Sequence, residues 1–185
     1  MNKSLEEYKI YLENLIKEKS SVIFSNGGID YASVLMSILL KNTKHSVHMF
    51  CEGFKPDLIK QDLYWNALKE YLSKKNNKLV VIINSDKWIN EEPLKCLFEE
   101  QKNRNNDNSI VVYKINEEGR KIIKEQFNGS LNNFAIFDDN MYRLEYLPSE
   151  FKAFGSFNNT NDAQLLLDLF NKITNHSQVV DGTIN

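Results

Sequence analysis

The residues best suited to chemistry in this sequence lie between positions 133 and 158, where three apolar segments alternate with polar residues. The candidate ligand-binding residues are Asp138, Arg143, Glu145, Ser156 and Asn158. Gly155 lets the backbone pass close to a ligand, while the Ser156 hydroxyl and the Asn158 amide offer hydrogen bonds. The stretch FKAFGSFN (151–158), just ahead of a helical pattern, therefore indicates either a phosphate-binding corner or a simple turn.

Arg143 and Glu145 are two residues apart in MYRLEYL, so in a strand they share one face. We expect an ion pair on a solvated surface, where it contributes little to stability. The alternative is a polar cluster in which this pair joins Asp138 and Ser156 around a ligand.

The three histidines do not point to a catalytic centre. His45 and His48 are far in sequence from GSFN, and His176 lies near the C-terminus. His45 and His48 with Cys51 could suggest a metal site, but strand residues three apart point to opposite faces. We therefore expect no metal site and no cofactor.

The segment SNGG (25–28) precedes a helical pattern but lacks the spacing of either glycine-rich phosphate-binding motif. Two glycines are also what a strand-to-helix turn with positive φ requires. We expect such a turn, with Asp30 as the helix cap.

The elements that position these residues follow from hydrophobic patterning. Strands are expected in SSVIF, HSVHMFCE, KLVVIINSD, SIVVYKI, NFAIFDD, MYRLEYL and EFKAFGSF, and helices at 30–42, from Asp57, at 91–101, after Asn116 and from Thr160. The β-branched run KLVVIINSD is typical of a strand covered on both faces. NFAIFDD and MYRLEYL alternate about Asp139 and Asn140, which predicts a hairpin.

Strands alternating with helices, then antiparallel strands, predict one α/β domain with a mixed, mostly parallel central sheet flanked by helices and antiparallel strands toward the C-terminus. We expect an N-terminal helix at 1–19, the α/β domain at 20–173 and a flexible tail at 174–185. The length of 185 residues fits one domain.

Composition excludes several classes of protein. The formal net charge of −2 gives no overall basic field for nucleic acid or anionic lipid. No apolar run is long enough for a membrane span, and acidic residues stand where a secretory signal would be apolar. Two cysteines, Cys51 and Cys96, fit reduced residues better than a disulfide scaffold. We expect a cytoplasmic protein.

The order of apolar strand, Asp, hairpin, strand, Gly-Ser-x-Asn and helix resembles the C-terminal half of a phospholipase D superfamily domain. FAIFDD (134–139) and GSFN (155–158) carry the resemblance, which would extend over roughly residues 20–173. In that family a histidine and a lysine, spaced H-x-K, precede the strand that ends in the aspartate.

Both of those catalytic residues are replaced in this sequence. With Asp138 as the family aspartate, Leu131 stands at the histidine position and Asn133 at the lysine position. With Asp139 instead, the residues are Asn132 and Phe134. The family's reaction needs imidazoles for attack on phosphorus and for protonation of the leaving oxygen. The resemblance therefore implies a pseudoenzyme.

Three functions remain open from the sequence. The first is a non-catalytic binding module for a protein partner or a phosphorylated ligand; the resemblance implies pairing, as a homodimer or with a related chain. The abundance of Lys, Asn and Ile would suit a bacterial or mobile-element accessory protein. Nucleic acid is less favoured as a partner because few lysines surround the candidate site.

The second function is a phosphodiesterase or nuclease with a metal held by Asp138, Asp139 and Glu145. The third is an unrelated α/β interaction protein in which GSFN is only a turn.

Overall fold

The computed structural model of the protein describes residues 3–54, 56–87, 90–92, 94–95, 98–99 and 110–180. Within these residues, one sheet contains β1 (Phe24–Asn26), β2 (Ser46–Cys51), β3 (Lys78–Ile83), β4 (Ile110–Ile115), β5 (Asn133–Phe137), β6 (Met141–Leu147), β7 (Lys152–Ser156) and β8 (Ser177–Val179). The strand order is β1-β7-β6-β5-β2-β3-β4-β8. The helices are α1 (Lys3–Lys17), α2 (Ile29–Asn42), α3 (Pro56–Ile59), α4 (Asp62–Ser73), α6 (Glu117–Gln126) and α7 (Thr160–Thr174), with a 3-10 turn, η1, at Pro148–Glu150.

The expected fold class is confirmed. Strands β2, β3 and β4 pair in parallel at the centre of the sheet, and β5, β6 and β7 follow as an antiparallel series. The β-branched run of β3 is almost wholly buried, as expected for a strand covered on both faces.

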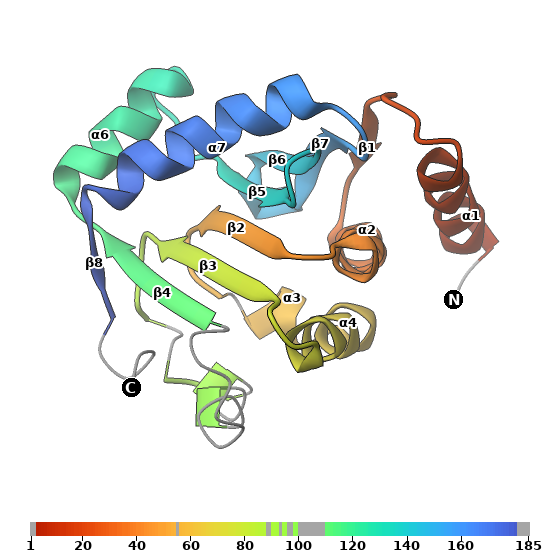
Figure 1. Ribbon diagram of the computed structural model, residues 1–185, viewed down its shortest axis with the longest axis horizontal. Helices are drawn as coiled ribbons and strands as arrows, with labels where there is room; N and C mark the ends of the chain where they lie inside the picture. The colour runs from red at the N-terminus through yellow and green to blue at the C-terminus, as the bar shows by residue number, and fades with distance from the viewer. Residues whose placement is uncertain are drawn as a thin grey trace.

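Helices cover both faces of the sheet (Figure 1). α6 and α7 lie on one face, and α2, α3 and α4 lie on the other, with α1 packed outside α2. Every residue of α2 from Ala32 to Leu40 is buried. A helix that is buried all round must have neighbours on all sides, and the sheet, α1 and α4 supply them.

The hairpin predicted about Asp139 and Asn140 is confirmed: β5 and β6 pair from Asn133 with Glu145 to Phe137 with Met141. Asn116 caps α6 as expected, because its side chain accepts the Gly119 N–H. The helix expected from Thr160 is α7, and the Asn159 side chain caps it by accepting the Asp162 N–H.

Several expected boundaries were wrong. β1 begins only at Phe24, and Val22 and Ile23 are about half exposed. The helix expected from Asp57 is split into α3 and α4. Gly28, at φ 84°, occupies the cap position of α2 in place of Asp30.

Within the segment expected as a tail (174–185), Ser177–Val179 form β8 against β4. Positions 181–185 and Cys96 lie outside the described residues. Among the described helices, none combines the length and apolarity needed to cross a bilayer.

Candidate functional site

A cavity lies at the carboxyl edge of the sheet, where β2 ends and β5 begins. In α/β sheets, ligands characteristically bind outside the carboxyl ends of the strands. The cavity, of about 70 Å³, is mainly apolar: its lining includes Met36, Met49, Cys51, Tyr64, Ala135 and Phe151. Its polar lining comes from Asn133, Arg143 and Glu145. We call it the carboxyl-edge cavity.

Arg143 and Glu145 form a buried ion pair beside this cavity. Their side chains are 8% and 6% exposed, and Arg143 Nη2 lies 2.9 Å from Glu145 Oε1. The expected placement of both residues on one strand face is confirmed, but the expected solvated surface was wrong, because Met36 of α2 and Phe151 cover this face of β6. A buried pair is tolerated only when its geometry is good and its remaining donors and acceptors are satisfied.

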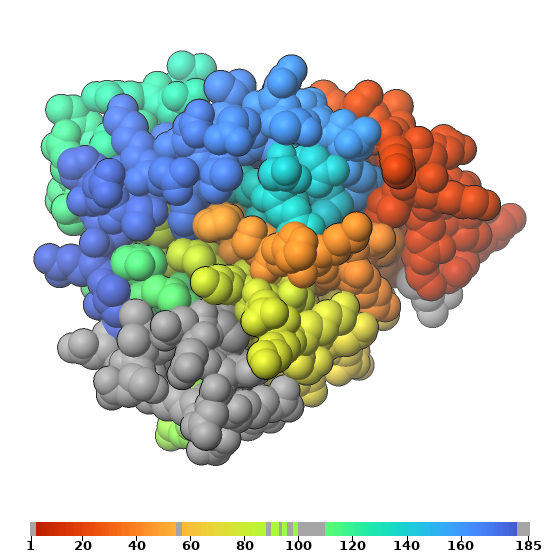
Figure 2. Space-filling model, in the orientation of Figure 1, coloured from red at the N-terminus to blue at the C-terminus, as the bar shows by residue number. Residues whose placement is uncertain are grey.

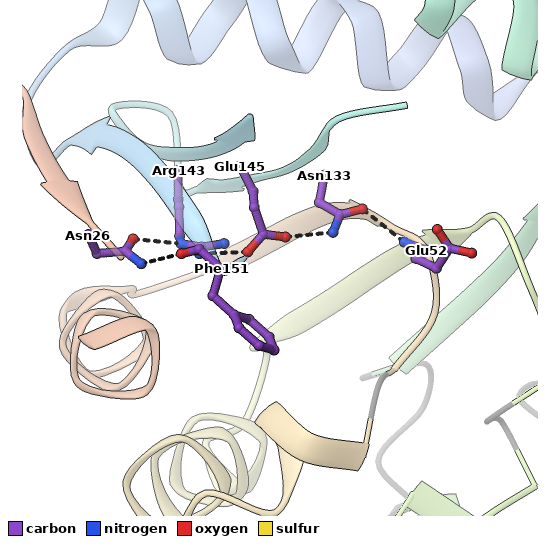
Figure 3. Close-up of polar contacts among 6 residues, drawn as sticks. All are labelled: Asn26, Glu52, Asn133, Arg143, Glu145 and Phe151. Carbon is purple, nitrogen blue, oxygen red and sulfur yellow. Dashed lines mark hydrogen bonds and ion pairs between the residues drawn. The ribbon is translucent and has the colours of Figure 1, made fainter. Parts of the chain in front are cut away.

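Arg143 gains further partners from β1 and from the residue that follows η1 (Figure 3). Its Nε donates to Asn26 Oδ1 at 3.4 Å, and its Nη2 also donates to the Phe151 carbonyl at 3.4 Å. Asn26 Nδ2 donates to that same carbonyl at 2.6 Å. The guanidinium is therefore held by three separate segments of the chain.

Asn133 satisfies the other side of the pair. Its Nδ2 donates to Glu145 Oε2 at 2.6 Å, while its Oδ1 accepts the Glu52 N–H at 2.9 Å (Figure 3). Both ends of this amide are thus engaged, and both carboxylate oxygens of Glu145 have a donor. Leu131, two residues earlier, packs against the apolar core beneath α6 and α7.

Asp138 lies at the opposite end of β5. Its carboxylate accepts the backbone N–H groups of Lys44 and His45 at 2.9 Å and of Ser46 at 3.1 Å. Asp138 has φ 53°, a left-handed conformation that Asp tolerates better than most residues. It fixes the α2–β2 turn to the hairpin.

The Gly-Ser-Phe-Asn corner is also at this end. Ser156 is fully buried and pairs with Tyr142, and its Oγ accepts the Asn158 N–H at 3.3 Å. Asn158 Nδ2 donates to the Lys19 carbonyl at 2.8 Å. Both groups therefore serve as turn contacts.

The structure does not bring these residues together in the single polar cluster that was the alternative. Arg143 and Glu145 line the carboxyl-edge cavity, whereas Asp138 and Asn158 line a separate groove. The length of β5 puts roughly 13 Å between these two edges at about 3.4 Å per residue. Strand alternation also turns Ser156 and Arg143 to opposite faces of the sheet.

The proposed metal site on Asp138, Asp139 and Glu145 was wrong for the same reason: Glu145 lies at the far edge. Within the described part of the chain, no three His, Cys, Asp or Glu side chains gather in a way that could hold a metal ion.

The second recess is a polar groove of about 810 Å³ at the amino edge of the sheet. Its lining includes Lys19, Lys44, His45, His48, Asp138 and Asn158. Figure 2 shows the β5–β6 hairpin (cyan) meeting α7 (blue), the start of β2 (orange) and the end of α1 (red) at this place. We call it the amino-edge groove.

His48 is the half-buried imidazole of this groove. Burial lowers its pKa, its Nδ1 is enclosed without a hydrogen-bond partner, and its ring packs edge-on against Phe170 at 5.2 Å. The register runs His48, Ile136, Tyr142, Ser156 across four strands. Three strand spacings of about 4.8 Å therefore separate His48 from Ser156 by roughly 14 Å.

Asn26 was missed as a site residue. It is 117 positions away from Arg143, and only the pairing of β1 with β7 brings it close. No spacing or motif in the sequence signals this contact.

No protein-family model matches the sequence, and no curated protein matches it. Solved structures do. TrmBL2, an archaeal chromatin protein whose structure shows a novel mode of DNA binding, matches with a TM-score of 0.57 and 9% identity over 95% of this chain. This chain spans 61% of that one.

Two further structures match over all or nearly all of their own length. The phospholipase D family member Nuc from Salmonella typhimurium matches with a TM-score of 0.54 and 14% identity, covering 86% of this chain and 99% of Nuc. NucT from Helicobacter pylori matches with a TM-score of 0.54 and 12% identity, covering 86% and 100%. The chain has the phospholipase D-like fold.

Proposed function

We propose that this protein is a non-catalytic binding domain, and that its ligand occupies the carboxyl-edge cavity. The observation that carries the proposal is the engagement of Asn133. This residue stands where the resemblance places the catalytic lysine, and both ends of its amide are used inside the protein. An amide in this state carries no positive charge for a phosphate, and one of its two N–H donors is already used by Glu145.

The neighbouring charges support the same conclusion. Phosphoryl transfer needs a nucleophile and cations that face the transferring group. At this edge Leu131 is packed in the core, and the Arg143 charge is offset by Glu145 at 2.9 Å. A phosphate entering the cavity would meet the Glu145 carboxylate together with the guanidinium.

The cavity favours a small, uncharged and mainly apolar ligand with one hydrogen-bonding group. Small-molecule sites typically combine an apolar lining with a few polar groups that set orientation. Met36, Met49 and Ala135 would contact the apolar part, while Arg143 or Asn133 would orient the polar group. An added anion or cation would be repelled by one member of the buried pair.

The comparisons are compatible with a binding role. TrmBL2 is described as a chromatin protein with a mode of DNA binding, so the fold occurs in a protein characterised by what it binds. The proposal includes pairing, as a homodimer or with a related chain, which sedimentation equilibrium at several concentrations will test.

Three methionines in the described chain allow a direct binding test. Met36 and Met49 line the carboxyl-edge cavity, and Met141 lines the amino-edge groove. With 13C-methyl methionine, butanone should cause saturable shifts at Met36 and Met49 and none at Met141. Butyrate, the charged analogue, should leave all three signals unchanged.

A cavity-filling variant provides the control. Ala135→Leu should abolish the butanone shifts by occupying the cavity. Ala163→Val, which enlarges a buried alanine in the core beneath α7, should retain them. Equal shifts at all three methionines, or unchanged binding by the filled variant, would contradict the proposed site.

A further inference from the structure

Six lysines are exposed around the amino edge of the sheet, on the opposite side from the carboxyl-edge cavity. They are Lys19, Lys41, Lys44, Lys74, Lys75 and Lys78. Lys41 ends α2, Lys44 precedes β2, and Lys74 and Lys75 follow α4 just ahead of Lys78 in β3. We call this set the amino-edge lysines.

Strand register places these lysines side by side. Ser46 of β2 pairs with Lys78 of β3, and the Lys78 N–H donates to the His45 carbonyl at 2.9 Å. In Figure 2 the turn before β3 (yellow) lies next to the start of β2 (orange), and the amino-edge groove opens beside it. The amino-edge lysines therefore extend from the groove along the amino edge of the sheet.

Five carboxylates share this edge: Glu18, Glu70, Asp138, Asp139 and Asp162, which accepts from Asn159 beside the groove. Asp138 is bound by three backbone N–H groups, and Glu70 lies 3.9 Å from Lys74. Six lysines against five acids leave one excess positive charge in a chain whose formal net charge is −2. The edge is thus locally basic although the chain is acidic.

The groove offers groups that bind phosphates rather than bases. Lysine, histidine and asparagine side chains line it, and such side chains make the positioning contacts to nucleic-acid backbones. Its aromatic member, Phe157, is 4% exposed and cannot stack on a base. Sequence-independent backbone binding is the mode that fits these residues.

We infer that the amino-edge lysines and the amino-edge groove bind the sugar–phosphate backbone of nucleic acid. This surface is separate from the cavity of the proposed function. Lysine contacts to phosphates release counterions, so the affinity depends on salt. With about four phosphates neutralised, the logarithm of the association constant should fall with a slope of about −3 to −4 against the logarithm of salt concentration.

Fluorescence anisotropy with a labelled duplex of mixed sequence tests this inference, between 50 and 200 mM salt. The charge-reversed protein Lys44→Glu, Lys75→Glu, Lys78→Glu should bind at least about tenfold more weakly, with the salt slope reduced by about one for each lost contact. The neutral triple Lys→Gln variant at the same positions should lose less affinity in the same direction.

A matched control reverses the charge of three exposed lysines elsewhere by substitution with Glu: Lys121, Lys124 and Lys172 on α6 and α7. It should change the affinity less than about threefold, because lysines remote from the bound backbone contribute only through screened long-range attraction. Duplex should also shift the Met141 methyl signal but not those of Met36 and Met49.

The inference fails if the wild-type protein does not bind duplex at 50 mM salt. Equal losses in the two charge-reversed proteins, or binding to phosphatidylglycerol vesicles without binding to duplex, would also overturn it. Butanone binding by the Lys44, Lys75, Lys78 variant should be unchanged, so failure here is distinguishable from failure of the proposed cavity.

Discussion

Asn133 lies directly opposite Glu145 in the β5–β6 pair, with its Nδ2 2.6 Å from the Glu145 Oε2. Through its Oδ1 the same amide accepts the Glu52 N–H that follows β2. One neutral side chain therefore joins three strands around a buried carboxylate. In the proposed account, this contact lies at the position where the resemblance places the family's lysine.

Asn133→Asp should destabilise the protein by about 1–3 kcal/mol, because a second carboxylate would face Glu145 and leave it without this donor. Urea unfolding at pH 7 measures the change in the free energy of unfolding. Asn132→Asp, the neighbouring substitution, is the matched control. Equal effects at the two positions would show that the Asn133–Glu145 contact makes no particular contribution to the free energy of unfolding.

Arg143→Met alone should cost about 3–5 kcal/mol of unfolding free energy, because it leaves the Glu145 carboxylate buried without its cation. The double variant Arg143→Met, Glu145→Leu should recover much of that loss, since no uncompensated charge remains. A double-mutant cycle from urea unfolding gives the coupling. Additive losses would mean that the two side chains do not act as a pair.

Asp138→Asn should lower the free energy of unfolding by about 1–3 kcal/mol, because three backbone N–H groups lose a charged acceptor. Asparagine tolerates the left-handed backbone conformation at this position, so the substitution adds no backbone strain. Asp139→Asn, at the exposed neighbour, should change stability by less than about 0.5 kcal/mol. Thermal unfolding of the two variants side by side distinguishes them.

The free energy of unfolding should fall as the pH drops below about 6.5, the ordinary pKa of histidine. Burial lowers the pKa of His48, so the unfolded chain takes up a proton that the folded chain resists. This contribution is present above pH 6.5, and its loss is complete once the pH has passed the lowered pKa. His48→Leu should flatten the difference in unfolding free energy between pH 7.5 and 5.5, whereas His45→Gln should not.

The parts of the fold that depend on local pattern could be predicted from the sequence. The buried run of β3 and the alternation on either side of Asp139 and Asn140 specify their structures within a few residues. The pairing of β1 with β7 could not be predicted, since it joins positions more than 120 residues apart and leaves no periodic signal.

Within the candidate site, only the relative placement of residues close together in one strand could be predicted. The spacing of Arg143 and Glu145 correctly put them on one strand face. The spacing could not reveal that Ser156 points to the other face, or that Asp138 stands at the other end of β5. Polar residues that are close in the sequence can lie at opposite ends of a strand or on opposite faces of the sheet, because side chains alternate along each strand.

Hydrolysis of bis-p-nitrophenyl phosphate tests the central claim most directly. The wild-type protein and the Arg143→Met, Glu145→Leu variant should both match the buffer rate, with and without Mg²⁺ or Mn²⁺. Turnover by the wild-type protein that disappears in the variant would show that the carboxyl-edge cavity is an active site, and would contradict the assignment of a non-catalytic binding domain.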